Sequence, residues 1–253
     1  MDELLQYRFK DGRLKDQSFG NLFLAAMDGI SNNFEEAVQK MSFVLAVTGK
    51  VIPVTLDNMT LKAKLENGNI IDGESNIAKG VIDNKSPIDE VFIEPRDAKA
   101  IKEALVAINE ADAVILGPGS LYTSIIPNLL VKEIRNALYK TNAIRIYVSN
   151  IMTQPGESDG YGVDDHIKAI NRHAKGKVVD YVLVNTGVIS RELERKYLND
   201  NSNMVTINEE EIKKLGIGII SSDFVKIGKG YIRHDTDKLA TILVETIMKK
   251  KLF

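Results

Sequence analysis

The chain of 253 residues is 44% hydrophobic and 27% charged, which is typical of a globular protein with a large core and excludes a disordered one. Its formal net charge is −2 and its basic residues are scattered, so we expect no nucleic-acid partner. The chain has no cysteine, which excludes disulfides and thiolate chemistry and is typical of a reducing compartment, so we expect a cytoplasmic location.

The beginning of the chain carries no targeting signal. No apolar run approaches the ~18 to 20 residues of a membrane helix, so we expect a soluble chain without membrane contact. Residues 1–7 are typical of the middle of a helix, because no start signal precedes Leu4 and Leu5. We therefore expect that a natural amino-terminal portion precedes this chain, and a membrane anchor could lie there.

Short alternating runs between residues 51 and 95 predict a small antiparallel insertion or edge lobe. The runs cover residues 51–56, 61–65, 70–73 and 91–93. Asn67-Gly68 and Asp72-Gly73 between them are hairpin signals.

From residue 96 onward, apolar strands alternate with amphipathic helices. Helices are predicted around residues 101–108, 127–138, 164–174 and 191–198, and strands at 113–116, 144–149, 179–185 and 204–207. Such alternation predicts a doubly wound α/β fold with a parallel sheet covered on both faces. A last helix over residues 235–251 starts at Asp235 as its cap and ends in three lysines. No linker or repeat interrupts the chain, so we expect one domain over residues 1–253.

The strand at 113–116 leads directly into a turn rich in glycine and hydroxyl groups, Gly117-Pro-Gly-Ser-Leu-Tyr-Thr-Ser124. A helix follows the turn, so backbone N–H groups and the positive helix end meet at one point, which favours binding of phosphate. Its candidate ligand residues are Gly117, Gly119, Ser120, Tyr122 and Thr123. An ordinary turn with local capping is the alternative.

Two further loops follow neighbouring strands, and ligands bind at the carboxyl ends of the strands in such sheets. The first offers Asn150, Thr153 and Gln154, and the second offers Asn185. These neutral groups can hydrogen-bond a base, sugar or amide, although they can also satisfy their own backbone.

The carboxylates and histidines of this region give weaker signals. Glu157 and Asp159 could act as acid and base or hold a divalent ion, but we expect them to be solvated. His166 and His173 are seven residues apart, unlike paired metal ligands, and are expected in the core or on the surface.

Tyr197 could stack on a base and Arg233 could bind a phosphate, but the residues alone favour a half-buried helix tyrosine and a surface arginine. The P-loop, the dinucleotide fingerprint and the serine-hydrolase elbow all fail on inspection, and no catalytic residue is assigned.

Five segments together resemble the CofD-like family, the 2-phospho-L-lactate transferase superfamily, and within it the bacterial YvcK branch, also called UPF0052 or gluconeogenesis factor. They are Ser18-Phe-Gly-Asn-Leu, Thr48-Gly-Lys-Val, the turn at 117–124, Asn150-Ile-Met-Thr-Gln-Pro-Gly and Gly160-Tyr161. The resemblance spans the whole chain and implies a Rossmann-like three-layer αβα fold.

The resemblance implies a regulatory protein that binds a UDP-sugar and influences carbon metabolism, the cell wall and cell shape. It carries over Tyr197 and Arg233 as recognition residues, and adds Asn21, Ser120, Thr153 and Gln154 to the pocket. The alternative is a Mg-dependent transferase that uses a nucleotide diphosphate carrier, as in the other branch; no metal ligands are assigned. A non-catalytic interaction module is a third hypothesis. The oligomeric state, a homo-oligomer included, and a regulatory protein partner stay open.

Two departures from the family limit the transfer. Its members begin with a strand and a Gly-Gly-Thr-Gly turn and then carry an Asp-Asp-Gly-Gly-Ser segment, and this sequence contains neither. Asp16-Gln17 stands where many relatives have Gly-His, so no role of that histidine is carried over. We expect an amino-terminally truncated member of the family.

Overall fold

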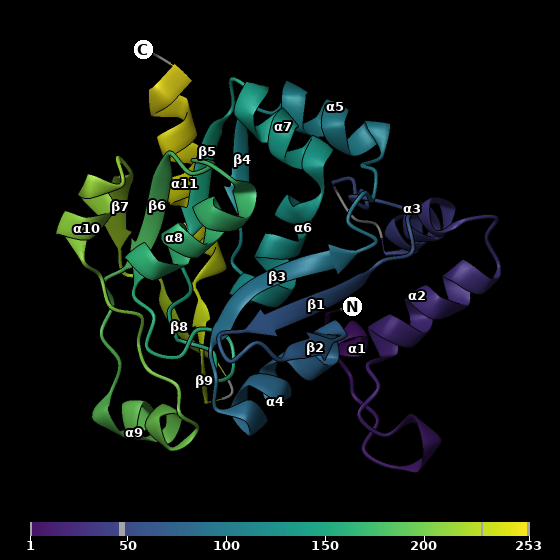
Figure 1. Ribbon diagram of the computed structural model, residues 1–253, viewed down its shortest axis with the longest axis horizontal. Coiled ribbons are helices and arrows are strands. Elements are labelled where there is room, and N and C mark those ends of the chain that lie inside the picture. The colour runs from purple at the N-terminus through teal and green to yellow at the C-terminus, as the bar shows by residue number, and fades with distance from the viewer. Residues whose placement is uncertain (1, 46–48, 229, 252–253) are drawn as a thin grey trace.

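A four-stranded parallel sheet organises most of the chain, as the computed structural model in Figure 1 shows. The structure describes residues 2–45, 49–228 and 230–251, so Met1 and Thr48 of the segments above lie outside it. The strands occur in the order β4, β5, β6, β7 across the sheet. Their bounds are Ala113–Leu116, Ile144–Val148, Tyr181–Asn185 and Gly218–Ser222.

Helices cover both faces of this sheet. Ile146 and Val148 of β5 pack with Leu239 of α11 (Thr236–Lys251), whereas Tyr147 between them packs with Ile167 of α8 (Val163–Ala174) on the opposite face. Neighbouring strand residues point to opposite faces, so a strand of continuous apolar residues serves two helix layers. The face with α8 also carries α5 (Lys102–Glu110), α6 (Ile126–Leu130), α7 (Lys132–Lys140) and α10 (Glu209–Lys214). The expected Rossmann-like three-layer αβα fold is confirmed.

A second sheet is antiparallel and packs on the same core. Its order is β2, β1, β3, with bounds Ile70–Asp72, Thr60–Leu65 and Ile88–Glu94. The hairpin signal at Asn67-Gly68 is confirmed, since the Gly68 N–H donates to the Leu65 carbonyl at 2.9 Å. Buried Ala63 and Val91 join this sheet to the main core.

Three expectations for local structure are wrong. Residues 51–56 form no strand, because Pro53 lacks an N–H and Ile52 and Val54 pack singly on the core. A helix, α4 (Glu74–Asn84), follows β2 in place of a second hairpin turn, and it buries Ile77 and Val81. Residues 204–207 contribute only isolated bridges, from Met204 and Thr206, and the fourth strand is β7 instead.

The amino-terminal helices pack on one another, at the right of Figure 1. They are α1 (Asp2–Leu5), α2 (Phe19–Gly29) and α3 (Phe34–Val44), with the short turn η1 (Gly12–Leu14) between the first two. Ser18 and Asn33 cap α2 and α3 through their side-chain oxygens. At the other end, Asp235 caps α11 as expected, since its Oδ1 accepts from the Lys238 N–H at 3.3 Å. No helix of the described residues is long and apolar enough to span a membrane.

A buried histidine links helix α8 to the antiparallel sheet. His173 on α8 accepts a hydrogen bond from the Val91 N–H of β3 at its Nε2 (3.0 Å), and its Nδ1–H donates to the Ala169 carbonyl (2.8 Å). Burial lowers the pKa of His173, because the charged ring would lose solvation. Protonation would also remove the acceptor that Val91 needs.

We therefore expect acid to weaken the fold through His173. A depressed pKa means that the unfolded state binds the proton first, so stability present above about pH 6.5 is lost as the pH falls. His173→Gln keeps a hydrogen-bonding side chain without titration, so it should lose less unfolding free energy than the wild type between about pH 7.5 and pH 5.5. Urea denaturation at both pH values measures this, and equal losses would contradict it.

Candidate ligand-binding site at the carboxyl edge of the sheet

The glycine turn after β4 lies closely against the end of β5. Gly117 has a φ of 83°, and a Cβ at this position would lie 3.1 Å from the Val148 carbonyl oxygen. Only glycine combines this backbone conformation with so close an approach. The chain then enters a π-helical turn, η2 (Leu121–Ile125), which leads into α6. The helical segment was expected to begin near Pro127, but it begins six residues earlier, at Leu121.

The turn offers two unused backbone donors. Within the described part of the chain, the N–H groups of Gly119 and Ser120 donate to no oxygen, whereas the Ser120 carbonyl accepts from Ser124 and Ile125, both at 3.0 Å. Two adjacent N–H groups at the start of a helix favour an anion. A mainly apolar cavity of about 450 Å³ adjoins the turn, between β4, α5 and α7.

A buried carboxylate holds the first turn of η2. Glu157 accepts from the Tyr122 N–H at 3.1 Å, from the Thr123 hydroxyl at 2.9 Å and from the Gln154 amide at 2.9 Å. Burial raises the pKa of Glu157, and the hydrogen bonds from Thr123 and Tyr122 oppose this rise. The expectation that Glu157 is solvated is wrong: its side chain is buried, and its carboxylate oxygens accept hydrogen bonds from donors inside the fold. Asp159 is exposed, as expected.

Ser120 and Gln154 are brought together as neighbours across two loops. The Ser120 hydroxyl donates to Gln154 Oε1 at 2.7 Å, so the glycine turn, Gln154 and Glu157 form one hydrogen-bonded chain. Thr153 instead turns toward another segment, where its hydroxyl accepts from the Asn203 N–H at 2.9 Å.

The side chain of Tyr122 lies in the core, not at the sheet edge. It is 2% exposed, and its hydroxyl is 2.8 Å from that of Tyr161. The Thr123 hydroxyl is engaged by Glu157. Ligand binding by Tyr122 and Thr123 stays a prediction, and in this arrangement their side chains shape the turn.

The two asparagines after β5 and β6 differ. Asn185 Oδ1 accepts from the Gly187 N–H at 3.2 Å and the Phe224 N–H at 2.9 Å, so it fixes its own loop. Asn150 Oδ1 is buried and has no partner among the described residues. An unpaired buried acceptor costs stability and needs a reason, so Asn150 is the stronger ligand candidate of the two.

Tyr197 contacts the hairpin strand that carries Arg233, through the residue that precedes Arg233. Tyr197 is on α9 (Arg191–Asn199), and Arg233 is on β9 (Tyr231–His234), which pairs with β8 (Val225–Gly228). The Tyr197 hydroxyl accepts from the Ile232 N–H at 2.8 Å, and the Arg233 guanidinium carbon is 5.5 Å from the Tyr231 ring centre. This hairpin is tied to the loop after β5, because His234 Nε2–H donates to the Ser149 carbonyl at 3.1 Å.

Asn21 is not joined to these residues. It is exposed on α2, and its N–H donates to Ser18 Oγ at 3.2 Å. No hydrogen bond among the described residues connects Asn21 with the glycine turn, so its role stays a prediction.

Sequence reasoning missed the roles of two residues at this edge. Glu157 accepts hydrogen bonds from the glycine turn, and His234 joins the hairpin to the loop after β5. Their partners are 35 and 85 residues away in the chain, so no local spacing signals them. His166 and His173 were expected either in the core or on the surface, and both are buried in the core. Among the described residues, no group of three or more acidic or histidine side chains could hold a metal ion.

The fold and this edge define a three-layer αβα protein with a glycine turn at the carboxyl end of its parallel sheet. The chain belongs to the CofD family, whose description is "2-phospho-L-lactate transferase CofD" and which matches residues 1–225.

Proteins named as gluconeogenesis factors are similar to the chain over nearly all of its length. It is 65% identical over 253 residues to the "Putative gluconeogenesis factor" of Clostridium acetobutylicum, covering 100% of this chain and 56% of that protein. It is 41% identical over 248 residues to the "Gluconeogenesis factor" of Bacillus subtilis, covering 98% of this chain and 77% of that protein. A crystal structure of a UPF0052 family member from Bacillus halodurans superposes with a TM-score of 0.88 at 40% identity, covering 96% of this chain and 77% of that one.

Proposed function

We propose that the carboxyl edge of the sheet binds a nucleotide sugar, specifically a UDP-sugar, and that the protein acts as a regulatory factor of carbon metabolism, the cell wall and cell shape. The observation that carries the proposal is the pair of unused N–H donors at Gly119 and Ser120, directly before a helix. Two such donors suit the oxygens of a diphosphate.

Other groups of the edge suit the remaining parts of such a ligand. The exposed guanidinium of Arg233 would contact a phosphate, and the half-buried ring of Tyr197 would receive the base or sugar. Asn150 would read a sugar hydroxyl or base N–H with the acceptor that lacks a partner. The names of the relatives connect the proposal with gluconeogenesis.

The second candidate is a Mg-dependent transferase, which the description of the matching family favours. It requires a metal held by carboxylates and a second pocket for an acceptor, whereas a regulator requires one nucleotide-sugar site.

Arg233→Ala tests the ligand site. Calorimetric titration of the chain with UDP-glucose and UDP-N-acetylglucosamine should give binding that weakens at least about tenfold in this variant, which corresponds to about 1.4 kcal/mol. Lys140→Ala is the control, because Lys140 is an exposed cation in the last turn of α7, which leads into the beginning of β5 at the opposite edge of the sheet, and it should bind as the wild type does.

Titration with GDP and NAD, with and without magnesium, separates the two candidates. Binding of GDP only with magnesium would favour the transferase. The Bacillus subtilis relative serves as the reference protein, and absence of UDP-sugar binding in both proteins would overturn the proposal and leave the interaction module.

A further inference from the structure

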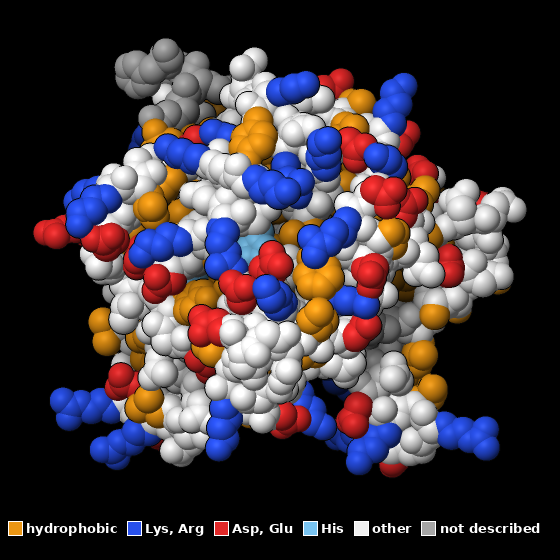
Figure 2. Space-filling model, viewed as in Figure 1, with side chains coloured by type: hydrophobic (Ala, Val, Ile, Leu, Met, Phe, Trp, Pro, Cys, Tyr) orange, Lys and Arg blue, Asp and Glu red, His pale blue; other side chains and the backbone are white. Residues whose placement is uncertain are grey.

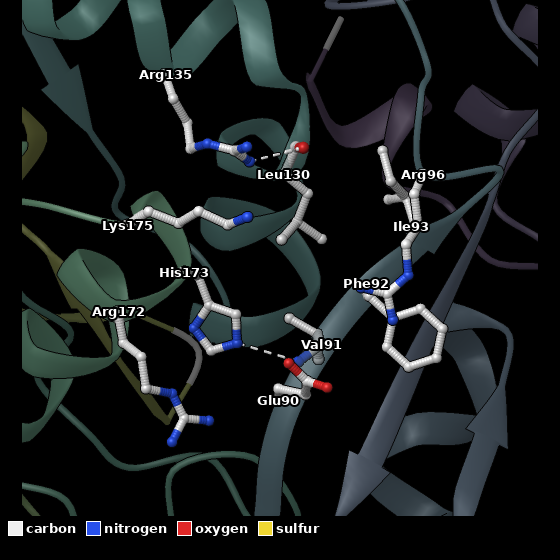
Figure 3. A pocket seen from close by; sticks show the side chains of 10 residues that line it. All are labelled: Glu90, Val91, Phe92, Ile93, Arg96, Leu130, Arg135, Arg172, His173 and Lys175. Atoms are coloured by element: carbon white, nitrogen blue, oxygen red, sulfur yellow. Dashed lines mark hydrogen bonds between the residues drawn. The ribbon is translucent and has the colours of Figure 1, made fainter.

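A separate pocket lies between β3 and the carboxyl-terminal end of α8 (Figure 3). Its volume is about 180 Å³, and its floor includes the buried side chains of Val91 and Ile93. The helix α8 begins at the carboxyl edge of the sheet and has 12 residues, so at 1.5 Å per residue its two ends are about 18 Å apart. This pocket, which we call the basic pocket because arginine and lysine side chains line it, is therefore distinct from the candidate nucleotide-sugar site.

Positive charge dominates the basic pocket. Four cations line it, and the lining holds one carboxylate, that of Glu90. Arg172 also lies 3.4 Å from Asp89, so two positive charges stay unmatched in a chain whose formal net charge is −2. The other three cations are Arg96, Arg135 and Lys175. Figure 2 shows a histidine at the surface of this region, surrounded by Lys and Arg side chains together with some Asp and Glu side chains.

Two of the guanidinium groups are held in place. Arg135 Nη1 donates to the carbonyls of Leu129 and Leu130, both at 2.8 Å. These two bonds do not use Nη2 and Nε, whose N–H groups can therefore donate to a ligand. Arg96 lies over the Phe92 ring, 4.4 Å from its centre. A positioned guanidinium loses little entropy when it binds an oxyanion.

Lys175 occupies a backbone position that favours glycine. It follows α8 with a φ of 62°, in the left-handed conformation. Figure 3 shows its ammonium group extending from the end of α8 toward Leu130, into the space that Arg135 also faces. The lysine thus brings a charge to the pocket at a position where glycine would be the less strained residue.

We infer that the basic pocket binds a phosphate dianion, either free or carried by a small metabolite. The two unmatched positive charges equal the charge of the dianion, and guanidinium forks bind phosphate through paired hydrogen bonds. The volume is below the ~300 to 1,000 Å³ of sites for larger ligands, which limits the ligand to a few heavy atoms. The apolar floor leaves room for a short carbon chain beside the phosphate.

Lys175→Gly tests this site without harming the fold. Glycine removes the charge and relieves the left-handed backbone, so the thermal midpoint should stay equal or rise. Calorimetric titration with inorganic phosphate at constant ionic strength should show a Kd at least about tenfold higher in Lys175→Gly and in Arg96→Gln than in the wild type. Lys85→Gly is the matched control, because Lys85 also follows a helix in the left-handed conformation, with a φ of 49°, and does not line the pocket.

A parallel titration with glycerol 3-phosphate identifies the source of the phosphate. Tighter binding than that of inorganic phosphate would assign the pocket to a phosphorylated metabolite, and equal binding would assign it to free phosphate. The inference is overturned if the wild type binds neither anion at millimolar concentration. It is also overturned if Lys175→Gly and Lys85→Gly bind phosphate equally, since the anion would then lie elsewhere, for example at the glycine turn.

Discussion

Replacing Gly156 by alanine is expected to lower the free energy of unfolding by about 3 kcal/mol or more. Gly156 has a φ of 78°, and a Cβ at this position would lie 2.3 Å from the carbonyl oxygen of Ala78 on α4. The obstacle is backbone, so it cannot rotate away as a side chain would. The loop after β5 and α4 must therefore separate, which urea denaturation monitored by circular dichroism will measure.

Gly160→Ala is the matched control for this prediction. Gly160 lies in the same loop with a φ of 71°, but nothing lies within 4 Å of the position that its Cβ would take. It should cost only the conformational penalty, about 1 kcal/mol. Equal losses in the two variants would show that the close approach to Ala78 does not matter and would contradict the prediction.

Glu157→Ala is expected to be nearly as damaging, with a loss of about 3 kcal/mol. The substitution leaves the Tyr122 N–H, the Thr123 hydroxyl and the Gln154 amide without their acceptor inside the fold. Hydrogen exchange of the Tyr122 amide should accelerate together with the fall in unfolding free energy.

Two comparisons make the test of Glu157 specific. Glu103→Ala removes an exposed carboxylate from α5 and should change the unfolding free energy by no more than about 0.5 kcal/mol. Glu157→Gln keeps one acceptor oxygen and should fall between this control and Glu157→Ala. An Ala variant as stable as the control would mean that the carboxylate does not hold the turn.

The periodicity of apolar residues predicted the strands and helices whose structure follows from the pattern within one segment. The strand at 113–116 is confirmed residue by residue, because four apolar residues lie between the polar Asp112 and the turn residue Gly117. The helix at 164–174 is also confirmed within one residue, since Ile167, Ile170 and Ala174 recur at helical spacing. The layers follow from the alternation of such segments.

Other parts depend on contacts that no local pattern contains. Residues 204–207 are apolar enough for a strand, but β7 takes the place next to β6, and Met204 only bridges to Met152. Glu157 has the sequence surroundings of a loop residue, and its burial follows from donors 34 and 35 positions earlier. The candidate edge was therefore predictable from the order of strands, whereas the partners of its side chains were not.

If the glycine turn binds a diphosphate as proposed, Glu157 would influence which anions the turn favours. Its carboxylate accepts from the N–H of Tyr122, the second residue of η2, and so places a negative group two residues beyond Ser120. A free nucleoside diphosphate gains a further charge near neutral pH, because a terminal phosphate has a second pKa of about 6, whereas a diphosphate esterified at both ends does not. Under the proposed function, repulsion from Glu157 would penalise this additional charge, so we expect the turn to bind an intact nucleotide sugar better than the nucleotide that remains when the sugar is removed.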